Sequence, residues 1–209
     1  MTEASSNFPC LLLAGGLSRR MGGGAKFLQM LDGKTLLARI IETLQPQVSE
    51  FILNMNIEIG DAAPTGIPVV KDSVAGFAGP LAGILTGLEY FQQKQVSSTH
   101  MLSIPTDAPF IPADLVSRLA AELEGSTRKI VMANSVGRVH PVVALWPIAL
   151  AEDLRMALVD EDLRKILVFA ERYDLTEVKW GEDEGDPFFN INCTDDLEAA
   201  RLKLSAENA

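Results

Sequence analysis

Apolar runs alternate along the chain with segments whose apolar positions follow a helical period. Strand-like runs cover residues 8–13, 50–55, 67–70, 100–104, 130–133, 142–146 and 177–180. Helical stripes cover residues 34–44, 81–91, 112–123, 163–170 and 195–204, with Thr194 as the expected N-cap of the last. Strands and helices in alternation predict an α/β fold in which helices cover both faces of a mainly parallel sheet.

Ligands of such sheets bind beyond the carboxyl ends of the strands. The residues to inspect are therefore those that follow Leu13, Leu53, Val70 and Ile104.

Composition fits one globular domain with a full core: the chain has 209 residues, of which 47% are hydrophobic. The longest apolar run, residues 141–151, is about half of the roughly 20 residues that a membrane helix needs. The first residues lack the pattern of a signal peptide, so a soluble cytoplasmic protein is expected. Cys10 and Cys193 are far apart, which predicts two reduced thiols and neither a disulfide framework nor a metal knuckle.

Charge is unevenly distributed. A net charge of −10 argues against a surface that coats nucleic acid or membrane. Residues 4–31 nevertheless contain no acid, while Arg19, Arg20 and Lys26 lie there. An acidic protein that keeps one segment free of carboxylates is expected to bind an anion at that segment.

The same segment is rich in glycine. Residues 15–24 contain five glycines, which let backbone N–H groups turn toward a phosphate chain, and Arg20 and Lys26 add positive charge. The spacing is not the dinucleotide fingerprint, because no G-x-G-x-x-G stands in register after the strand. It is not the Walker pattern either, because Lys26 is followed by Phe27. The alternative interpretation is a flexible glycine loop with surface cations.

The segment after Ile104 holds an aspartate between two prolines. Asp107 is thereby a rigidly placed carboxylate, and Mg²⁺ commonly takes one or two such groups together with substrate phosphates. A turn-capping aspartate is the alternative. Beside a phosphate-binding loop, the metal site is favoured.

The other strand ends leave their alternatives open. Asn54 could read a base or be a plain loop asparagine, and Asp72 could contact a base or ribose or cap a turn. The sequence Gly-Pro-Leu-Ala-Gly at 79–83 opens a helix that allows close approach of a ligand. His140 could contact substrate or be structural.

Four blocks of the sequence together are similar to one enzyme family. They are Leu-Ala-Gly-Gly-x-Ser-x-Arg-Met-Gly-x-x-x-Lys at 13–26, Asp72 with the block at 79–83, Pro-x-Asp-x-Pro-Phe at 105–110, and Phe-Asn-Ile-Asn at 189–192. Over nearly its whole length the chain resembles the molybdenum cofactor guanylyltransferases. The resemblance implies a Rossmann-like three-layer sandwich of the nucleotidyltransferase type. It also implies transfer of GMP from GTP to molybdenum-bound molybdopterin, with release of pyrophosphate.

The blocks differ in specificity. The first block alone indicates only a nucleotidyltransferase, and Gly15-Gly16 favours the guanylyl branch over the cytidylyl branch. The closing Asn-Ile-Asn is the most discriminating, although Cys-Thr-Asp-Asp follows it where the family normally has Thr-Pro-Glu. Both asparagines remain, so this departure is not expected to affect the chemistry.

Carried over position by position, the resemblance implies a set of site residues. The nucleotide would be bound by Leu13, Ala14, Gly15, Gly16, Arg20, Lys26, Asn54, Asp72 and Asp107. Lys26 and Asp107 would be catalytic, with Asp107 also the ligand of a Mg²⁺ cofactor, and Asn190 and Asn192 would bind the pterin substrate. Residues 1–209 would form one domain with a GTP-binding half at about 8–110 and a pterin half at about 111–209.

The resemblance also implies partners. GTP and molybdenum-bound molybdopterin would be the substrates, with upstream molybdenum-insertion proteins and downstream molybdoenzyme chaperones as protein partners of a monomer. Neither nucleic acid nor membrane is expected to bind. The alternatives are a cytidylyl or sugar-phosphate nucleotidyltransferase of the same fold, or a GTP-binding module without turnover. The missing G-x-G-x-x-G disfavours a nicotinamide-binding oxidoreductase.

Overall fold

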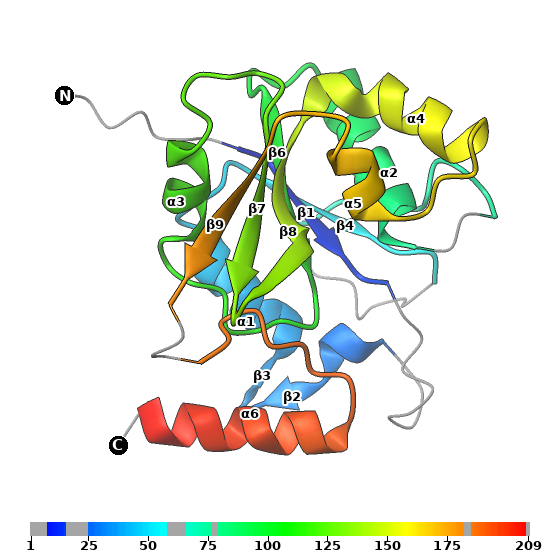
Figure 1. The fold of residues 1–209 in the computed structure, drawn as a ribbon. Coiled ribbons are helices and arrows are strands. Elements are labelled where there is room, and N and C mark those ends of the chain that lie inside the picture. Colours follow the sequence, from blue (N-terminus) through cyan, green and yellow to red (C-terminus); the bar gives the residue numbers. More distant parts are fainter. Residues whose placement is uncertain (1–7, 16–24, 58–65, 77–78, 182–184, 208–209) are drawn as a thin grey trace.

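A seven-stranded sheet forms the centre of the computed structural model, which describes residues 8–15, 25–57, 66–76, 79–181 and 185–207 (Figure 1). The strand order is β5-β4-β1-β6-β8-β7-β9, and each adjacent pair is parallel except the two made by β8. The strands are β1 (Cys10–Leu13), β4 (Phe51–Asn54), β5 (Val69–Val70), β6 (His100–Pro105), β7 (Ile130–Ser135), β8 (Arg138–Pro147) and β9 (Leu175–Trp180). The predicted mainly parallel sheet is confirmed.

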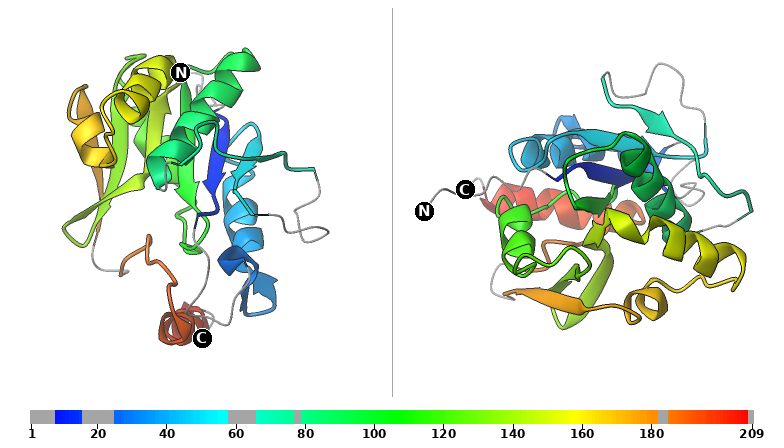
Figure 2. Two further views of the ribbon diagram at one scale, coloured as in Figure 1. Left: turned by 90° about the vertical axis from the view of Figure 1, so that its right-hand side faces the viewer. Right: turned by 90° about the horizontal axis from the view of Figure 1, so that it is seen from above.

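Helices cover both faces of this sheet. They are α1 (Leu36–Leu44), α2 (Pro80–Gln93), α3 (Leu115–Ala121), α4 (Ala151–Val159) and α5 (Ile166–Ala170). The C-terminal helix α6 (Thr194–Glu207) lies apart from them, and η1 (Lys26–Leu28) and η3 (Ile148–Leu150) are short 3-10 turns. Successive side chains of a strand point to opposite faces. Cys10 and Leu12 accordingly pack with α1 and α3 in one core, and Leu11 and Leu13 pack with α2, α4 and α5 in the other. The three layers are visible in Figure 2.

The C-terminal helix belongs to neither layer. It packs on a small hairpin of β2 (Met30–Leu31) and β3 (Lys34–Thr35), below the sheet in the view of Figure 1. A third apolar cluster joins the two parts and consists of Leu31, Leu36, Ile191, Leu197 and Ala200. The last segment of the chain is thereby held beside the β2–β3 hairpin and the start of α1.

The register of the sheet brings four strand ends together. Leu13 of β1 pairs with Asn54 of β4 on one side and with Pro105 of β6 on the other, and Asn54 pairs in turn with Val70 of β5. The segments after Leu13, Leu53, Val70 and Ile104 therefore share one edge of the sheet, as predicted.

Several element boundaries differ from the prediction. The helix expected at residues 34–44 begins at Leu36, because Lys34–Thr35 pairs in a hairpin whose turn places Asp32 and Gly33 at positive φ. The strand expected at 142–146 begins at Arg138, so His140 lies within β8 and not before it. Helix α4 was not predicted; its short stripe of Ala151, Leu154 and Ala157 is buried against the second core.

Two smaller expectations can be compared with the structure. Among the described residues, no helix is long and apolar enough to cross a membrane. Cys10 and Cys193 are both free thiols, as predicted. Cys10 is fully buried, and this burial raises the pKa of its thiol far above the usual range.

Close contact between α2 and the sheet yields the first prediction. A Cβ atom on Gly83 would lie 2.3 Å from Leu13 Cδ2 and 2.4 Å from Asn54 Oδ1. One on Gly87 would also meet side-chain ends, those of Met101 and Leu11, but at the longer distances of 2.7 and 2.8 Å. Gly83→Ala should lower the free energy of unfolding by about 1–3 kcal/mol, and by more than Gly87→Ala does, because the amide of Asn54 is fixed by hydrogen bonds. Urea unfolding measures both; a Gly83→Ala protein as stable as the wild type would contradict the packing.

The hydrogen bonds at the start of α6 yield the second prediction. Asp196 Oδ2 accepts the backbone N–H groups of Asn192, at 2.6 Å, and Cys193, at 3.0 Å, so the carboxylate caps the helix from inside its first turn. These bonds, led by that from Asn192, hold the pKa of Asp196 below its ordinary value. Asp196→Ala should cost about 1 kcal/mol of stability at pH 7.

The pH dependence of this cost follows from the sign of the shift. A carboxyl whose pKa is lowered by folding contributes fully above its unfolded pKa and loses that contribution as the pH falls through the folded pKa. The gap in stability between wild type and Asp196→Ala should therefore close in acid. Asp195→Ala, an exposed acid of the same helix turn, is the control. A gap that is independent of pH, or equal for the two variants, would show that Asp196 is not the cap.

Candidate functional site

A cleft of about 620 Å³ lies at the shared edge of the strands, and we call it the strand-end cleft. Its volume is within the range typical of small-molecule sites. It is lined by Leu13, Ala14, Gly15, Asn54, Met55, Asn56, Ile57, Asp72, Gly79, Pro80, Pro105, Asp107, Val142 and Asn190. The four predicted strand-end segments therefore meet in one place.

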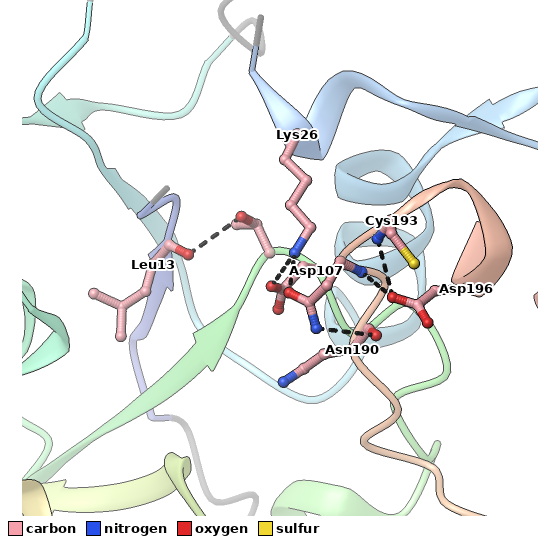
Figure 3. Close-up of polar contacts among 8 residues, drawn as sticks. Leu13, Lys26, Asp107, Asn190, Cys193 and Asp196 are labelled. Carbon is pink, nitrogen blue, oxygen red and sulfur yellow. Dashed lines mark hydrogen bonds and ion pairs between the residues drawn. The ribbon is translucent and has the colours of Figure 1, made fainter. Parts of the chain in front are cut away.

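An ammonium group bridges two polar side chains in this region (Figure 3). Lys26 Nζ donates to Asp107 Oδ2 and to Asn192 Oδ1, both at 2.7 Å. The side chains of Lys26 and Asp107 are only 14% and 22% exposed, so the ion pair is partly withdrawn from water. Three distant parts of the chain thus meet at one cation: the first residue of η1, the turn after β6 and the segment before α6.

The backbone on both sides of Asp107 is fixed. Thr106 donates its N–H and its hydroxyl to the carbonyl of Leu13, at 3.1 and 3.2 Å. The carbonyl of Asp107 accepts the N–H of Ile191 at 2.9 Å. The carboxylate predicted to be rigid is therefore tied to β1 on one side and to the Asn190–Asn192 segment on the other.

A second polar cluster lies across the cleft. Asn54 Nδ2 donates to Asp72 Oδ1 at 2.9 Å, and Asn56 Nδ2 donates to Asp72 Oδ2 at 2.8 Å. The Asp72 N–H returns a bond to Asn56 Oδ1 at 2.9 Å. Since both carboxylate oxygens are occupied by amides, Asp72 organises the amides of the cleft in addition to lining it.

The start of α2 forms another wall of the cleft. Pro80 is the first helical residue, where the missing N–H of proline costs nothing, and Gly79 before it has a φ of 147°. Both residues line the cleft. A side chain at Gly79 would be strained, which explains the glycine at this turn.

Metal-binding capacity in the cleft is limited. No group of three or more His, Cys, Asp or Glu side chains that could hold a metal ion occurs among the described residues. Asp107, with the amide oxygens of Asn190 and Asn192 nearby, supplies few oxygen donors. Such a set suits Mg²⁺, which keeps several waters and takes phosphate oxygens from a substrate. Thiolate-binding metals would find no matching ligands here.

The structure brings most predicted site residues together. Leu13, Ala14, Gly15, Asn54, Asp72, Asp107 and Asn190 line the strand-end cleft, and Lys26 and Asn192 are bonded at its edge. Gly16 and Arg20 lie outside the described residues.

Three contributing residues were not predicted. Asn56 stands two positions after Asn54, and a second amide at that spacing is a signal available in the sequence. Thr106 and Asp196 act by holding backbone, and only the fold shows which carbonyl or N–H each one meets.

The sequence matches a known protein family over most of its length. Residues 10–175 match the family model described as the MobA-like NTP transferase domain. The chain is 49% identical over 204 residues to the molybdenum cofactor guanylyltransferase of Bradyrhizobium sp. (strain ORS 278), which covers 97% of this chain and 96% of that protein.

Solved structures show the same fold. Molybdopterin-guanine dinucleotide biosynthesis protein A from Archaeoglobus fulgidus has a TM-score of 0.73 at 24% identity, covering 95% of this chain and all of that chain, 100%. Rv0371C from Mycobacterium tuberculosis H37Rv, in complex with manganese, has a TM-score of 0.63 at 18% identity, covering 94% and 98%. The predicted sandwich of the nucleotidyltransferase type is confirmed. By its family match and its full-length identity, the chain belongs to the MobA-like NTP transferases and, among these nucleotidyltransferases, to the molybdenum cofactor guanylyltransferase family.

Proposed function

We propose that this protein transfers GMP from GTP to the phosphate of molybdenum-bound molybdopterin and releases pyrophosphate. The observation that carries the proposal is the Lys26 bridge to Asp107 and Asn192 beside a cleft of about 620 Å³ at the strand ends. It supplies a cation for phosphates, a carboxylate for a divalent ion and an amide for the second substrate. The name of the relative that is 49% identical supports the same reaction.

The nucleotide is assigned to the side of the cleft between β1 and β5. The backbone of Leu13, Ala14 and Gly15 lies at the carboxyl end of β1, where a ligand can approach main-chain groups. Asn54 and Asp72 form a fixed hydrogen-bonding edge opposite. We assign Gly16 and Arg20 to the phosphates on their residue types alone.

Lys26 is assigned to the triphosphate. Its charge is compensated by Asp107, with Nζ and Oδ2 2.7 Å apart. A triphosphate presents several anionic oxygens to the same ammonium, so Lys26 can pass from the carboxylate to the phosphates with its charge still paired. That exchange frees Asp107 Oδ2 for a divalent cation.

Asp107 is assigned to a Mg²⁺ cofactor. The donor set around it fits that ion, and the manganese complex of the mycobacterial fold neighbour is consistent with a divalent ion in this fold. When bound, Mg²⁺ offsets the negative charge of the reacting phosphates. Asp107 holds the cation at a fixed place because its backbone is tied to Leu13 and Ile191 through Thr106 and its own carbonyl.

The reaction requires no further catalytic side chain beyond those that bind the substrates and the cation. An oxygen of the acceptor phosphate forms a bond to the α-phosphorus of GTP as the bond to the β-phosphate oxygen breaks, and pyrophosphate leaves with that electron pair. The attacking oxygen is already ionised at pH 7, so no general base is needed. Positioning and charge neutralisation dominate such transfers. We assign Asn190 and Asn192 to the acceptor, at the opposite side of Asp107 from Leu13.

The proposal keeps one domain with two functional halves. The GTP-binding half spans about 8–110 and the pterin half about 111–209, and Val142 and Asn190 extend the cleft into the second half. We propose a cytoplasmic monomer that meets molybdenum-insertion proteins and molybdoenzyme chaperones and binds neither nucleic acid nor membrane.

The reaction is tested by release of pyrophosphate from GTP with Mg²⁺, in the presence and absence of molybdenum-bound molybdopterin. Release that requires the acceptor and prefers GTP to CTP is expected. Preference for CTP, or turnover of a sugar phosphate, would assign the chain to another branch of the fold. GTP binding without pyrophosphate release would indicate a binding module.

The role of Asp107 gives a sharper prediction. Asp107→Asn keeps the size of the side chain but removes the charge that holds a hard cation. Turnover should fall about a hundredfold or more, equivalent to about 2.7 kcal/mol of barrier. The Mg²⁺ concentration needed for half-maximal rate should rise, while the melting temperature changes little.

Asp114→Asn is the matched control, because Asp114 is an exposed acid that follows the same strand. Turnover and melting temperature should both remain near wild type in that variant. If Asp107→Asn retained normal turnover and an unchanged Mg²⁺ requirement, Asp107 would be a structural aspartate only.

A further inference from the structure

A small pocket adjoins the strand-end cleft. It has a volume of about 190 Å³ and is lined by Arg138, His140, Phe188 and neighbouring residues; we call it the His140 pocket. Pro105, Val142 and Asn190 line both the pocket and the cleft, so the two spaces are continuous. A second cleft, of about 600 Å³, has no lining residue in common with the strand-end cleft.

This continuity bears on the acceptor. Its phosphate must reach the α-phosphate of the bound nucleotide, so the rest of the acceptor must occupy space connected to the strand-end cleft. Among the cavities lined by described residues, the His140 pocket meets that condition through Asn190. Arg138 adds a positive charge suited to an anionic acceptor.

A buried hydrogen-bond network fixes the ring of His140. Its Nε2 lies 2.7 Å from Ser135 Oγ, and Ser135 Oγ lies 2.6 Å from Asp186 Oδ1. The carboxylate oxygen can only accept, so Ser135 donates its one proton to Asp186 and accepts from Nε2–H. Nδ1 is therefore the unprotonated nitrogen of the neutral ring. Burial, the main cause, lowers the pKa of His140 below its usual value and keeps the ring neutral near pH 7.

The remaining nitrogen is available to a ligand. His140 Nδ1 has no hydrogen-bond partner among the described residues. In the same part of the chain, Trp180 Nε1 is the one fully buried side-chain nitrogen or oxygen without a partner, so Nδ1 is not fully buried. His140 is one of the residues that line the pocket, although it is only 7% exposed. The Phe188 ring, with its centroid 5.0 Å from that of His140, supplies an aromatic wall.

We propose that His140 is a specificity-determining residue of the acceptor site, whose Nδ1 accepts a hydrogen bond from a ring or amino N–H of the heterocycle in the His140 pocket. The inference rests on the proposed function, since a pterin carries such donors and a phosphate arm. Ser135 and Asp186 are positioning residues that fix the proton on Nε2.

Two substitutions separate Nδ1 from the network. His140→Asn retains an amide oxygen near the place of Nδ1 but cannot reach Ser135. His140→Gln extends an amide N–H toward Ser135 and Asp186 but provides no acceptor at the place of Nδ1. For each variant, pyrophosphate release is measured at saturating GTP and Mg²⁺ over a range of molybdenum-bound molybdopterin concentrations, and GTP affinity is measured directly.

The expected result is an asymmetry between the variants. His140→Gln should raise the KM for the acceptor about tenfold, with kcat and GTP affinity near wild type. His140→Asn should raise that KM clearly less than His140→Gln does, because it keeps an acceptor near the place of Nδ1. If instead the acceptor KM rose in His140→Asn and stayed near wild type in His140→Gln, the ring would serve only to hold Ser135 and Asp186. That result would overturn the proposal.

Equal effects of the two substitutions on the acceptor KM, large or small, would overturn it as well, because Nδ1 would then have no separate role. Failure of the proposed function is distinguishable, since the wild-type protein itself would release no pyrophosphate from GTP when the acceptor is added. In that event both the function and the acceptor assignment fall.

Discussion

The parallel pairing of β1 with β4 on one side and β6 on the other is the constraint on which the site depends. It puts Leu13, Asn54 and Pro105 in one row, with Val70 next to Asn54. Every segment that follows these residues must then leave the sheet at the same edge. The strand-end cleft is the consequence of this register, because polar residues after a buried strand can turn toward a common space without entering the core.

The Lys26 bridge joins the edge of the sheet to the C-terminal part of the chain, because Lys26 binds both Asp107 and Asn192. Asn192 reaches the ammonium because α6 is held on the β2–β3 hairpin by an apolar cluster and because Asp196 caps its first turn. Packing energy far from the cleft thereby sets the position of two polar groups at its edge. The bridge also explains how a carboxylate and an ammonium are accommodated in a partly buried place, since each compensates the charge of the other.

The two halves of the chain contribute in different ways. The first half supplies backbone groups and amides at strand ends, whose positions follow from the sheet. The second half supplies side chains on β8 and on the segment before α6. The Ser135–Asp186 pair fixes the ring of His140 on β8, and the packing of α6 positions Asn192. Backbone groups and amides at strand ends suit a ligand that many proteins of one fold share. Side chains on β8 and before α6 can differ between families and so suit a ligand that one family binds.

The sequence by itself determined the class of fold and most of the polar residues that line the strand-end cleft. Alternating apolar runs and stripes indicate a parallel α/β sheet, and the strand-end rule then selects Leu13, Asn54, Asp72 and Asp107, because these links are local and periodic. Short elements were not predicted: β2 and β3 have two residues each, and α4 has only four buried positions, which pack in the second core.

Only the tertiary structure decided what each polar group meets. Asp72 is occupied by two asparagine amides, His140 is enclosed in β8 with one nitrogen fixed, and Lys26 reaches a residue 166 positions away. Such partners come from segments whose distance in the chain carries no information about their distance in space. Their meeting is fixed by sheet register and by the packing of α6, which are properties of the whole fold.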